Sequence, residues 1–69
     1  MRMSARNMLK GEIVSVELGA VMANIKIRLG TQEIITSVIT KDSATEMGLE
    51  KGDKVFAVIK STEVMVAKE

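Results

Sequence analysis

The most constraining feature of the sequence is a regular alternation between residues 21 and 29. One face of this segment carries Asn24, Lys26 and Arg28. The other face is entirely apolar and consists of Val21, Ala23, Ile25, Ile27 and Leu29. A repeat of two residues is the period of a β-strand with one buried face, whereas a helix would repeat every 3.6 residues. We therefore expect a strand over residues 21–29 whose apolar face is covered by the rest of the chain.

Segments on both sides of this strand are rich in β-branched residues and are bounded by turn residues. They predict four more strands and one short helical segment. The expected strands are residues 9–18, 33–40, 54–60 and 64–67, and the helical segment is residues 41–47. The third strand should pair antiparallel with the second across the hairpin at Gly30-Thr31. The prediction is an all-β fold, namely a five-stranded, closed OB-like barrel with one short helix between strands 3 and 4.

The helical segment has recognisable end signals. Ser43 and Glu46 have the spacing of a capping box, and Gly48 follows at the position of a helix C-cap. Thr40 or Asp42 would serve equally well as the N-cap, so the start of the helix is open by a few residues. We expect one or two helical turns at this position.

The fourth predicted strand is apolar on both faces. Val55, Ala57 and Ile59 alternate with Phe56 and Val58. A strand of this kind must be covered on both sides, but one small barrel has only one interior. We therefore expect the second face to contact another subunit.

The length of the chain points to the same conclusion. Sixty-nine residues form a single domain, 1–69, which buries too little surface to be more than marginally stable alone. The chain has no Cys and no His, so neither a disulfide nor a Cys/His zinc site can add stability. Oligomerisation is the remaining source of additional burial.

Composition also limits the classes of function. The apolar runs are too short to span a bilayer and the first residues lack a signal peptide, so we expect a cytoplasmic protein without membrane contact. A nucleic-acid-binding OB module would need aromatic stacking residues and a basic groove, but the chain has one aromatic residue and a net charge of +1. No nucleophile–base pair and no phosphate loop are visible, so we do not expect an enzyme. A purely structural assembly protein stays a further alternative.

The two ends of the chain carry similar groups of donors. Ser4-Ala5-Arg6-Asn7 and Lys60-Ser61-Thr62 each combine one long cation with hydroxyl and backbone N–H groups, and neither contains a carboxylate. A small polyvalent oxyanion requires such donors, because it offers acceptors only. The same residue types are also typical of solvated surface charges and helix caps. The pattern indicates a local anion site built from both ends of the chain.

These end motifs, taken with others between them, resemble the molbindin (Mop) family of small molybdate- and tungstate-binding proteins, which consist of a single Mop/TOBE-type domain. The resemblance covers essentially the whole chain. It rests on Ser4-Ala5-Arg6-Asn7, Leu9-Lys10-Gly11, the run from Ile35 to Thr40, Asp42-Ser43, Gly48-Leu49 and the run from Val58 to Met65. It implies storage or buffering of the oxyanion at the subunit interfaces of a homohexamer, a trimer of dimers, for molybdenum homeostasis. It implies no catalysis, no cofactor and no direct cation ligand.

The resemblance also implies a set of oxyanion-binding residues from two subunits. One subunit supplies Ser4, the backbone around Ala5, Arg6, Lys60 and Ser61. Its neighbour supplies Thr40 and Ser43. Molybdate is a tetrahedral dianion, so the two cations match its charge and the hydroxyl groups supply further donors.

The resemblance is less direct about one backbone segment, residues 19–21, and about one residue, Asp42. The family has a second oxyanion site on its threefold axis, for which the backbone of Gly19, Ala20 and Val21 is a candidate because successive N–H groups form anion-binding nests. Asp42 lies between Thr40 and Ser43, where an inward carboxylate would repel an anion. We expect its side chain to point away from the ligand.

Overall fold

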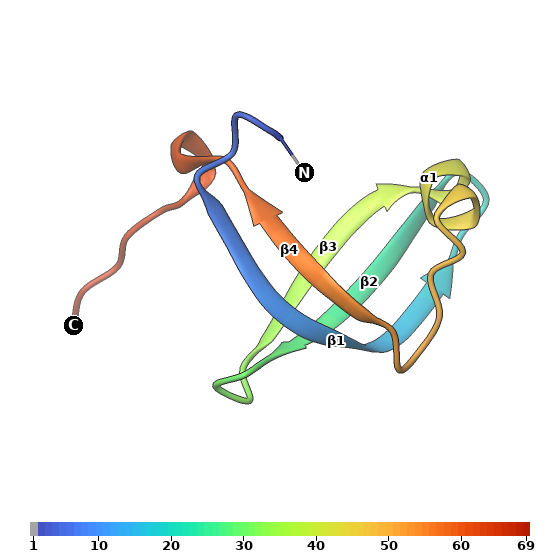
Figure 1. Cartoon of the computed structure of the whole chain (residues 1–69), viewed down its shortest axis with the longest axis horizontal. Helices are drawn as coiled ribbons and strands as arrows, with labels where there is room; N and C mark the ends of the chain where they lie inside the picture. The colour runs from blue at the N-terminus through green and yellow to red at the C-terminus, as the bar shows by residue number, and fades with distance from the viewer. Residues whose placement is uncertain (1) are drawn as a thin grey trace.

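The computed structural model describes residues 2–69, and within them four strands, one α-helix and one 3-10 turn are present (Figure 1). In chain order the elements are β1 (Asn7–Leu18), β2 (Met22–Leu29), β3 (Ile34–Thr40), α1 (Lys41–Glu46), β4 (Lys54–Ile59) and η1 (Ser61–Glu63). The helix therefore lies between β3 and β4, as the sequence predicts. The bounds of β2, β3 and α1 agree with the expected segments to within one residue.

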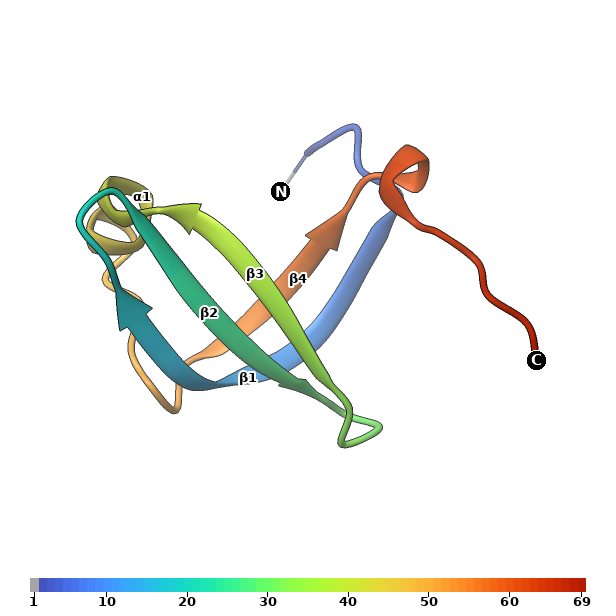
Figure 2. The ribbon, with the colours of Figure 1, turned by 180° about the vertical axis from the view of Figure 1, so that it is seen from behind.

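The four strands form one antiparallel sheet in the order β3-β2-β1-β4. The sheet is strongly curled, and β1 bends as it passes from one half of the sheet to the other (Figures 1 and 2). The register of β1 against β2 shifts between Ile13 and Ser15, which marks a β-bulge at Val14. An extra residue in one strand increases the local bend and twist, so the bulge allows β1 to pair with both neighbours of a curved sheet.

The core lies on the concave face of this sheet. Ala23, Ile25 and Ile27 of β2 are buried and Leu29 is half-buried, so the predicted inward face is confirmed for these four residues. Val21, the fifth predicted member, precedes β2 in the turn and is 70% exposed, so its prediction is wrong for the single chain. Ile13 of β1 and Ala57 of β4 complete the buried set from the sheet. Ala44, a sixth buried residue, reaches the same cluster from α1 and closes one end of it.

The end of α1 is stabilised by a glycine. Gly48 has φ +62°, a left-handed conformation that L-residues with a Cβ adopt at a cost. Its N–H donates to the carbonyl of Thr45 at 3.0 Å, and the N–H of Leu49 donates to the carbonyl of Ala44 at 3.1 Å. This pair of bonds is a Schellman motif, which satisfies carbonyls that the helix leaves without partners. The predicted role of Gly48 in ending the helix is confirmed.

The predicted fifth strand and the closed barrel are both wrong for the single chain. Residues 64–69 adopt no regular secondary structure, and β3 and β4 remain the two edges of the sheet in the part of the chain that the structure describes. The C-terminal segment instead extends away from the sheet (Figures 1 and 2). Met65 and Val66 are each 93% exposed. The β-propensity of this segment does not produce a strand because no strand of the same chain lies beside it.

One of the two apolar faces of β4 is exposed to solvent in the single chain. Phe56 and Val58 are 43% and 45% exposed, whereas Ala57 is buried and Val55 and Ile59 are half-buried. The two alternating sets of residues therefore lie on opposite faces of β4, as the sequence indicates, and the structure shows that the Val55, Ala57 and Ile59 face is the inner one. Contact of the outer face with another subunit stays a prediction. No helix within residues 2–69 is long and apolar enough to cross a membrane.

Candidate oxyanion-binding site

The two ends of the chain meet at one end of the sheet. Asn7, the first residue of β1, is paired with Ile59, the last residue of β4. The Asn7 Nδ2 group also donates to the carbonyl of Ile59 at 3.3 Å, a contact between residues 52 positions apart. Arg6 and Lys60 directly flank this pair, so both cations emerge at the same end of the β1–β4 ladder. Antiparallel pairing thus brings together the two motifs that the sequence analysis linked.

Local structure presents these residues to solvent. Ser4 and Arg6 are exposed and Ala5 is half-buried. Lys60 has extended backbone angles and precedes η1, which begins at Ser61, and both side chains are exposed. No side chain competes for the two cations within residues 2–69, where the only ion pair joins other residues.

Thr40 and Ser43 lie together at the start of α1. Thr40 is the last residue of β3 and the N-cap of the helix. Its Oγ1 accepts a hydrogen bond from the Ser43 N–H at 3.1 Å, and its hydroxyl donates to the Ser43 Oγ at 2.8 Å. Of the open alternatives for the N-cap, Thr40 is therefore confirmed and Asp42 is wrong. Asp42 lies exposed in the first turn of the helix. A negative charge there interacts favourably with the helix dipole.

The Thr40–Ser43 corner and the Arg6–Lys60 pair lie at opposite ends of the molecule (Figures 1 and 2). β1 begins beside Arg6 and runs for 12 residues to Leu18 near the other end. An extended strand of that length covers roughly 35 Å. One chain therefore cannot bring both groups to one small anion, and a site containing both requires two copies of the chain.

The candidate backbone nest at Gly19, Ala20 and Val21 forms the exposed turn between β1 and β2. The Gly19 N–H already donates to the carbonyl of Met22 at 2.8 Å, so it is not available to an anion. The carbonyl of Val21 accepts from the Lys41 N–H at 2.8 Å, which places this turn beside the start of α1. The turn lines a cavity of about 440 Å³.

The wall of that cavity also contains Glu17. A carboxylate there opposes the binding of an anion, because like charges repel strongly across a short distance. Within one chain, the turn thus offers two of the three expected N–H groups and one unfavourable charge. The assignment of Gly19, Ala20 and Val21 stays a prediction.

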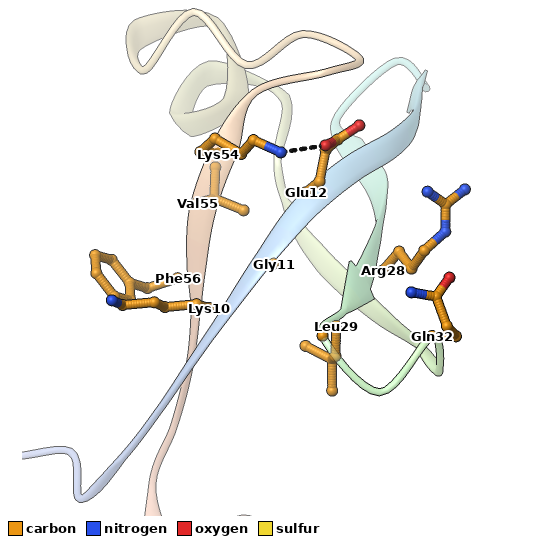
Figure 3. A pocket seen from close by; sticks show the side chains of 10 residues that line it. Lys10, Gly11, Glu12, Arg28, Leu29, Gln32, Lys54, Val55 and Phe56 are labelled. Atoms are coloured by element: carbon orange, nitrogen blue, oxygen red, sulfur yellow. Dashed lines mark hydrogen bonds and ion pairs between the residues drawn. The ribbon is translucent and has the colours of Figure 1, made fainter.

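A larger pocket, of about 560 Å³, lies away from both groups and was not found by sequence reasoning (Figure 3). It is lined by Lys10, Gly11, Glu12, Arg28, Leu29, Gly30, Gln32, Lys54, Val55 and Phe56. We call it the β1 pocket, because β1 runs through its centre. Its members are far apart in the sequence and are neighbours only because of the strand register, so no local motif marks it.

An ion pair between Lys54 and Glu12 spans the β1 pocket from β4 to β1 (Figure 3). The hydrogen bond from Lys54 and its positive charge lower the pKa of the Glu12 carboxyl below its ordinary value, and Arg28 adds a smaller effect. Glu12 is therefore ionised at neutral pH. Within residues 2–69 no group of three or more His, Cys, Asp or Glu side chains could hold a metal ion.

A curled antiparallel sheet of OB-like topology, with cations gathered where its first and last strands meet, is typical of small ligand-binding β-domains. Comparison with known proteins identifies the family of β-domains to which this chain belongs. The TOBE domain model matches residues 3–66, and the chain belongs to the TOBE domain family. The resemblance inferred from the motifs is thereby confirmed.

Individual relatives show the same relationship. A probable molybdenum-pterin-binding protein from Haemophilus influenzae is 42% identical over 69 residues, which is 100% of both chains. The solved structure of a molybdate-binding protein from Sporomusa ovata has a TM-score of 0.93 and 37% identity, covering 99% of this chain and 100% of that one. A structure of the cytoplasmic molybdate-binding protein ModG, with molybdate bound, has a TM-score of 0.83 and 43% identity. It covers 88% of this chain and 43% of ModG. The OB-like fold class is confirmed by these neighbours.

Proposed function

We propose that this protein is a single-domain binding protein, residues 1–69, that holds molybdate or tungstate in the cytoplasm and buffers its concentration. The observation that carries the proposal is the meeting of Arg6 and Lys60 at one end of the β1–β4 ladder, flanking the paired Asn7 and Ile59. Relatives of similar length are named for binding molybdenum-pterin or molybdate, and ModG is described as cytoplasmic.

The chemistry of the chain ends suits a tetrahedral dianion. Arg6 supplies a planar fork of N–H donors and Lys60 supplies a compact point charge, so together they balance the charge of the ligand. Charge-assisted hydrogen bonds from such groups are roughly twice as strong as neutral ones. The remaining ligands from this subunit are Ser4, the backbone at Ala5, and Ser61.

A second subunit completes the site with Thr40 and Ser43. These two residues lie at the far end of the same chain, so only a neighbouring copy brings them to the anion. Their hydroxyl groups are close together, with 2.8 Å between the two oxygens, and offer adjacent contacts to one ligand. The anion then lies between subunits and links their association to its own binding.

The assembly that we propose is a homohexamer arranged as a trimer of dimers. The apolar surface of the isolated chain supports self-association, because monomers rarely leave large apolar patches in water. Val38 on edge strand β3 and Val58 on edge strand β4 are 59% and 45% exposed, and Met65 and Val66 of the C-terminal segment are each 93% exposed. A second copy that packs against the sheet edges and this segment would cover them.

The proposed role is binding without catalysis. The site consists of hydroxyl, amide and cationic donors that stabilise a bound oxyanion, and the ligand undergoes no bond change there. The backbone turn at Gly19, Ala20 and Val21 would serve as a second oxyanion site only where neighbouring copies compensate for the charge of Glu17.

Calorimetric titration with molybdate, tungstate and sulfate tests this function, with the mass of the oligomer measured by light scattering on the same samples. The wild-type protein should bind molybdate and tungstate tightly. Arg6→Ala and Lys60→Ala should each weaken binding by roughly 10- to 100-fold, since each removes charged hydrogen bonds. Both variants should keep the oligomer mass of the wild type.

Lys51→Ala is the matched control, because Lys51 is an exposed cation in the turn before β4. Lys51→Ala removes one positive charge, as Arg6→Ala and Lys60→Ala do, but should leave molybdate binding unchanged. Absence of binding to all three anions would contradict the proposal. Salt-sensitive binding to single-stranded DNA, with no response to molybdate, would instead favour a nucleic-acid-binding OB module.

A further inference from the structure

Asn7 is the one residue of the Ser4–Asn7 motif that has no assigned role at the oxyanion site. Its Nδ2 group donates a hydrogen bond to the carbonyl of Ile59 at 3.3 Å. A carbonyl only accepts hydrogen bonds, so the amide must turn its nitrogen toward Ile59. The side chain is therefore committed to the backbone of β4, and its remaining oxygen is an acceptor, which an oxyanion does not bind.

Asn7 makes this contact from the inner face of the sheet. The register pairs it with Ile59, a half-buried residue on the inner face of β4, and the Asn7 side chain is itself half-buried. Both partners belong to one chain, so the contact does not depend on what covers the outer face of β4. Asn is a poor strand former, so β-propensity does not explain its place at the first position of β1.

The hydrogen bond fixes the peptide unit that joins Ile59 to Lys60. The Ile59 carbonyl and the Lys60 N–H belong to one planar group, so a bond to the carbonyl sets the orientation of both. On the other side of Lys60, its own carbonyl accepts from the Glu63 N–H at 2.9 Å. The Lys60 side chain makes no capping bond to η1. Both peptide units that flank Lys60 are thus held, and Asn7 holds the one next to the sheet.

The bond lies where the strand pair ends. Asn7 and Ile59 are the last pair of the β1–β4 ladder, and within residues 2–69 the edge strand β4 has β1 as its only neighbour. Arg6 and Lys60 leave the ladder directly after this pair, and their like charges repel one another. Chain ends fray unless they are tied down, so loss of the Asn7 bond would let the two cations separate.

We propose that Asn7 is a positioning residue of the oxyanion site. It holds Arg6 and Lys60 at the spacing that lets both reach one tetrahedral anion, and it does not contact the anion itself. The inference rests on the proposed function, since this spacing matters only where both cations bind one ligand. Donors that are held in place before binding give a higher affinity, because less ordering is required when the ligand arrives.

Molybdate titration of variants of the full chain, followed by calorimetry, tests this role. Asn7→Leu has nearly the shape of the wild type but no donor, and should weaken molybdate binding by roughly tenfold. Asn7→Gln retains the amide and should recover most of that loss. Thr36→Val is the matched control, because it removes another cross-strand hydrogen bond, from Lys26 Nζ to Thr36 Oγ1 at 3.2 Å in the β2–β3 pair. It should bind molybdate as the wild type does.

A double-mutant cycle separates positioning from direct contact. In a Lys60→Ala background the spacing of the two cations no longer matters, so Asn7→Leu should change the affinity by less than roughly twofold. An undiminished tenfold loss in that background would make Asn7 a direct ligand and overturn the proposal. In the ligand-free protein, 15N relaxation should show more backbone motion at Lys60 and Ser61 in Asn7→Leu than in the wild type, and no such increase in Thr36→Val.

The titrations also separate this proposal from the proposed function. A wild-type protein that binds no molybdate would overturn both. A wild-type protein that binds molybdate, with Asn7→Leu binding equally well, would overturn the role of Asn7 alone. The oligomer mass is measured on every sample. Asn7→Ser, whose side chain is shorter by one bond, replaces Asn7→Leu if that variant does not assemble, and the same tenfold loss is expected.

Discussion

Gly11→Ala should destabilise the protein, although glycine in a strand is normally a weak choice. A Cβ at position 11 would lie 2.5 Å from Cγ2 of Ile27 and 2.8 Å from the carbonyl oxygen of Arg28. Ile27 is only 5% exposed and packs in the core, and the Arg28 carbonyl belongs to the backbone of β2. Relief of both contacts requires β1 and β2 to move apart at the centre of the sheet.

The expected size of the effect follows from two opposing terms. Replacing a strand glycine by alanine ordinarily adds roughly 0.5–1 kcal/mol of stability, because the unfolded chain loses freedom. Overpacking in a closely packed core costs roughly 1–3 kcal/mol, and two simultaneous contacts below 3 Å place this site near the upper end. The net destabilisation is then about 2 kcal/mol. For a domain of this size it corresponds to a fall in Tm of roughly 8–16 °C.

Thermal unfolding by circular dichroism tests this estimate, at one fixed protomer concentration because oligomers gain stability with concentration. Gly30→Ala is the matched control. A Cβ at Gly30 meets no atom within 4 Å, and its φ is not in the left-handed region, so its Tm should equal or slightly exceed that of the wild type. A Gly11→Ala variant as stable as Gly30→Ala would refute the packing argument.

Two further predictions concern local interactions. Thr40→Ala removes the N-cap hydrogen bond from Ser43 and should lower the free energy of unfolding, measured by urea titration, by about 1 kcal/mol. Thr40→Ser keeps a hydroxyl group at the N-cap and should retain most of this stability. Equal stability of the two variants would contradict the role of the cap. The pKa of Glu12 is lowered on folding, so its pairing with Lys54 stabilises the protein above the ordinary value of 4.5 and is lost as pH falls through the lower folded pKa. Glu12→Gln should therefore flatten the decrease of the urea midpoint below pH 4.5, and an unchanged acid profile would show that the pair does not contribute.

Much of the fold could be predicted from the sequence because local patterns carry it. The alternation of Ala23, Ile25 and Ile27 marks β2 and its buried face, and Gly48 marks the end of α1. The predicted strand over residues 64–67 is wrong because β-propensity reports how well a side chain fits on a sheet. It does not show that a partner strand is available. The predicted closure of the barrel is wrong for the same reason, since closure depends on the missing fifth strand.

The candidate sites show a similar division. Arg6 and Lys60 could be linked by their chemistry, and the antiparallel pairing of β1 with β4 brings them to one end of the sheet. The β1 pocket could not be found, because its members become neighbours only through a strand register that is shifted by the bulge at Val14. The sequence grouped Phe56 with Val58 on one face of the fourth strand, but no sequence pattern indicates that Lys10 and Arg28 share a pocket with Phe56.

The central claim is that one oxyanion is held by the chain ends of one subunit and the start of α1 in another. A crystal structure of the molybdate complex, with molybdenum located by its anomalous scattering, tests this claim most directly. We predict a molybdenum peak whose oxygens contact the Arg6 guanidinium and Lys60 Nζ of one subunit and the Thr40 or Ser43 hydroxyl of its neighbour. A peak held by other residues, or by a single subunit alone, would contradict the account.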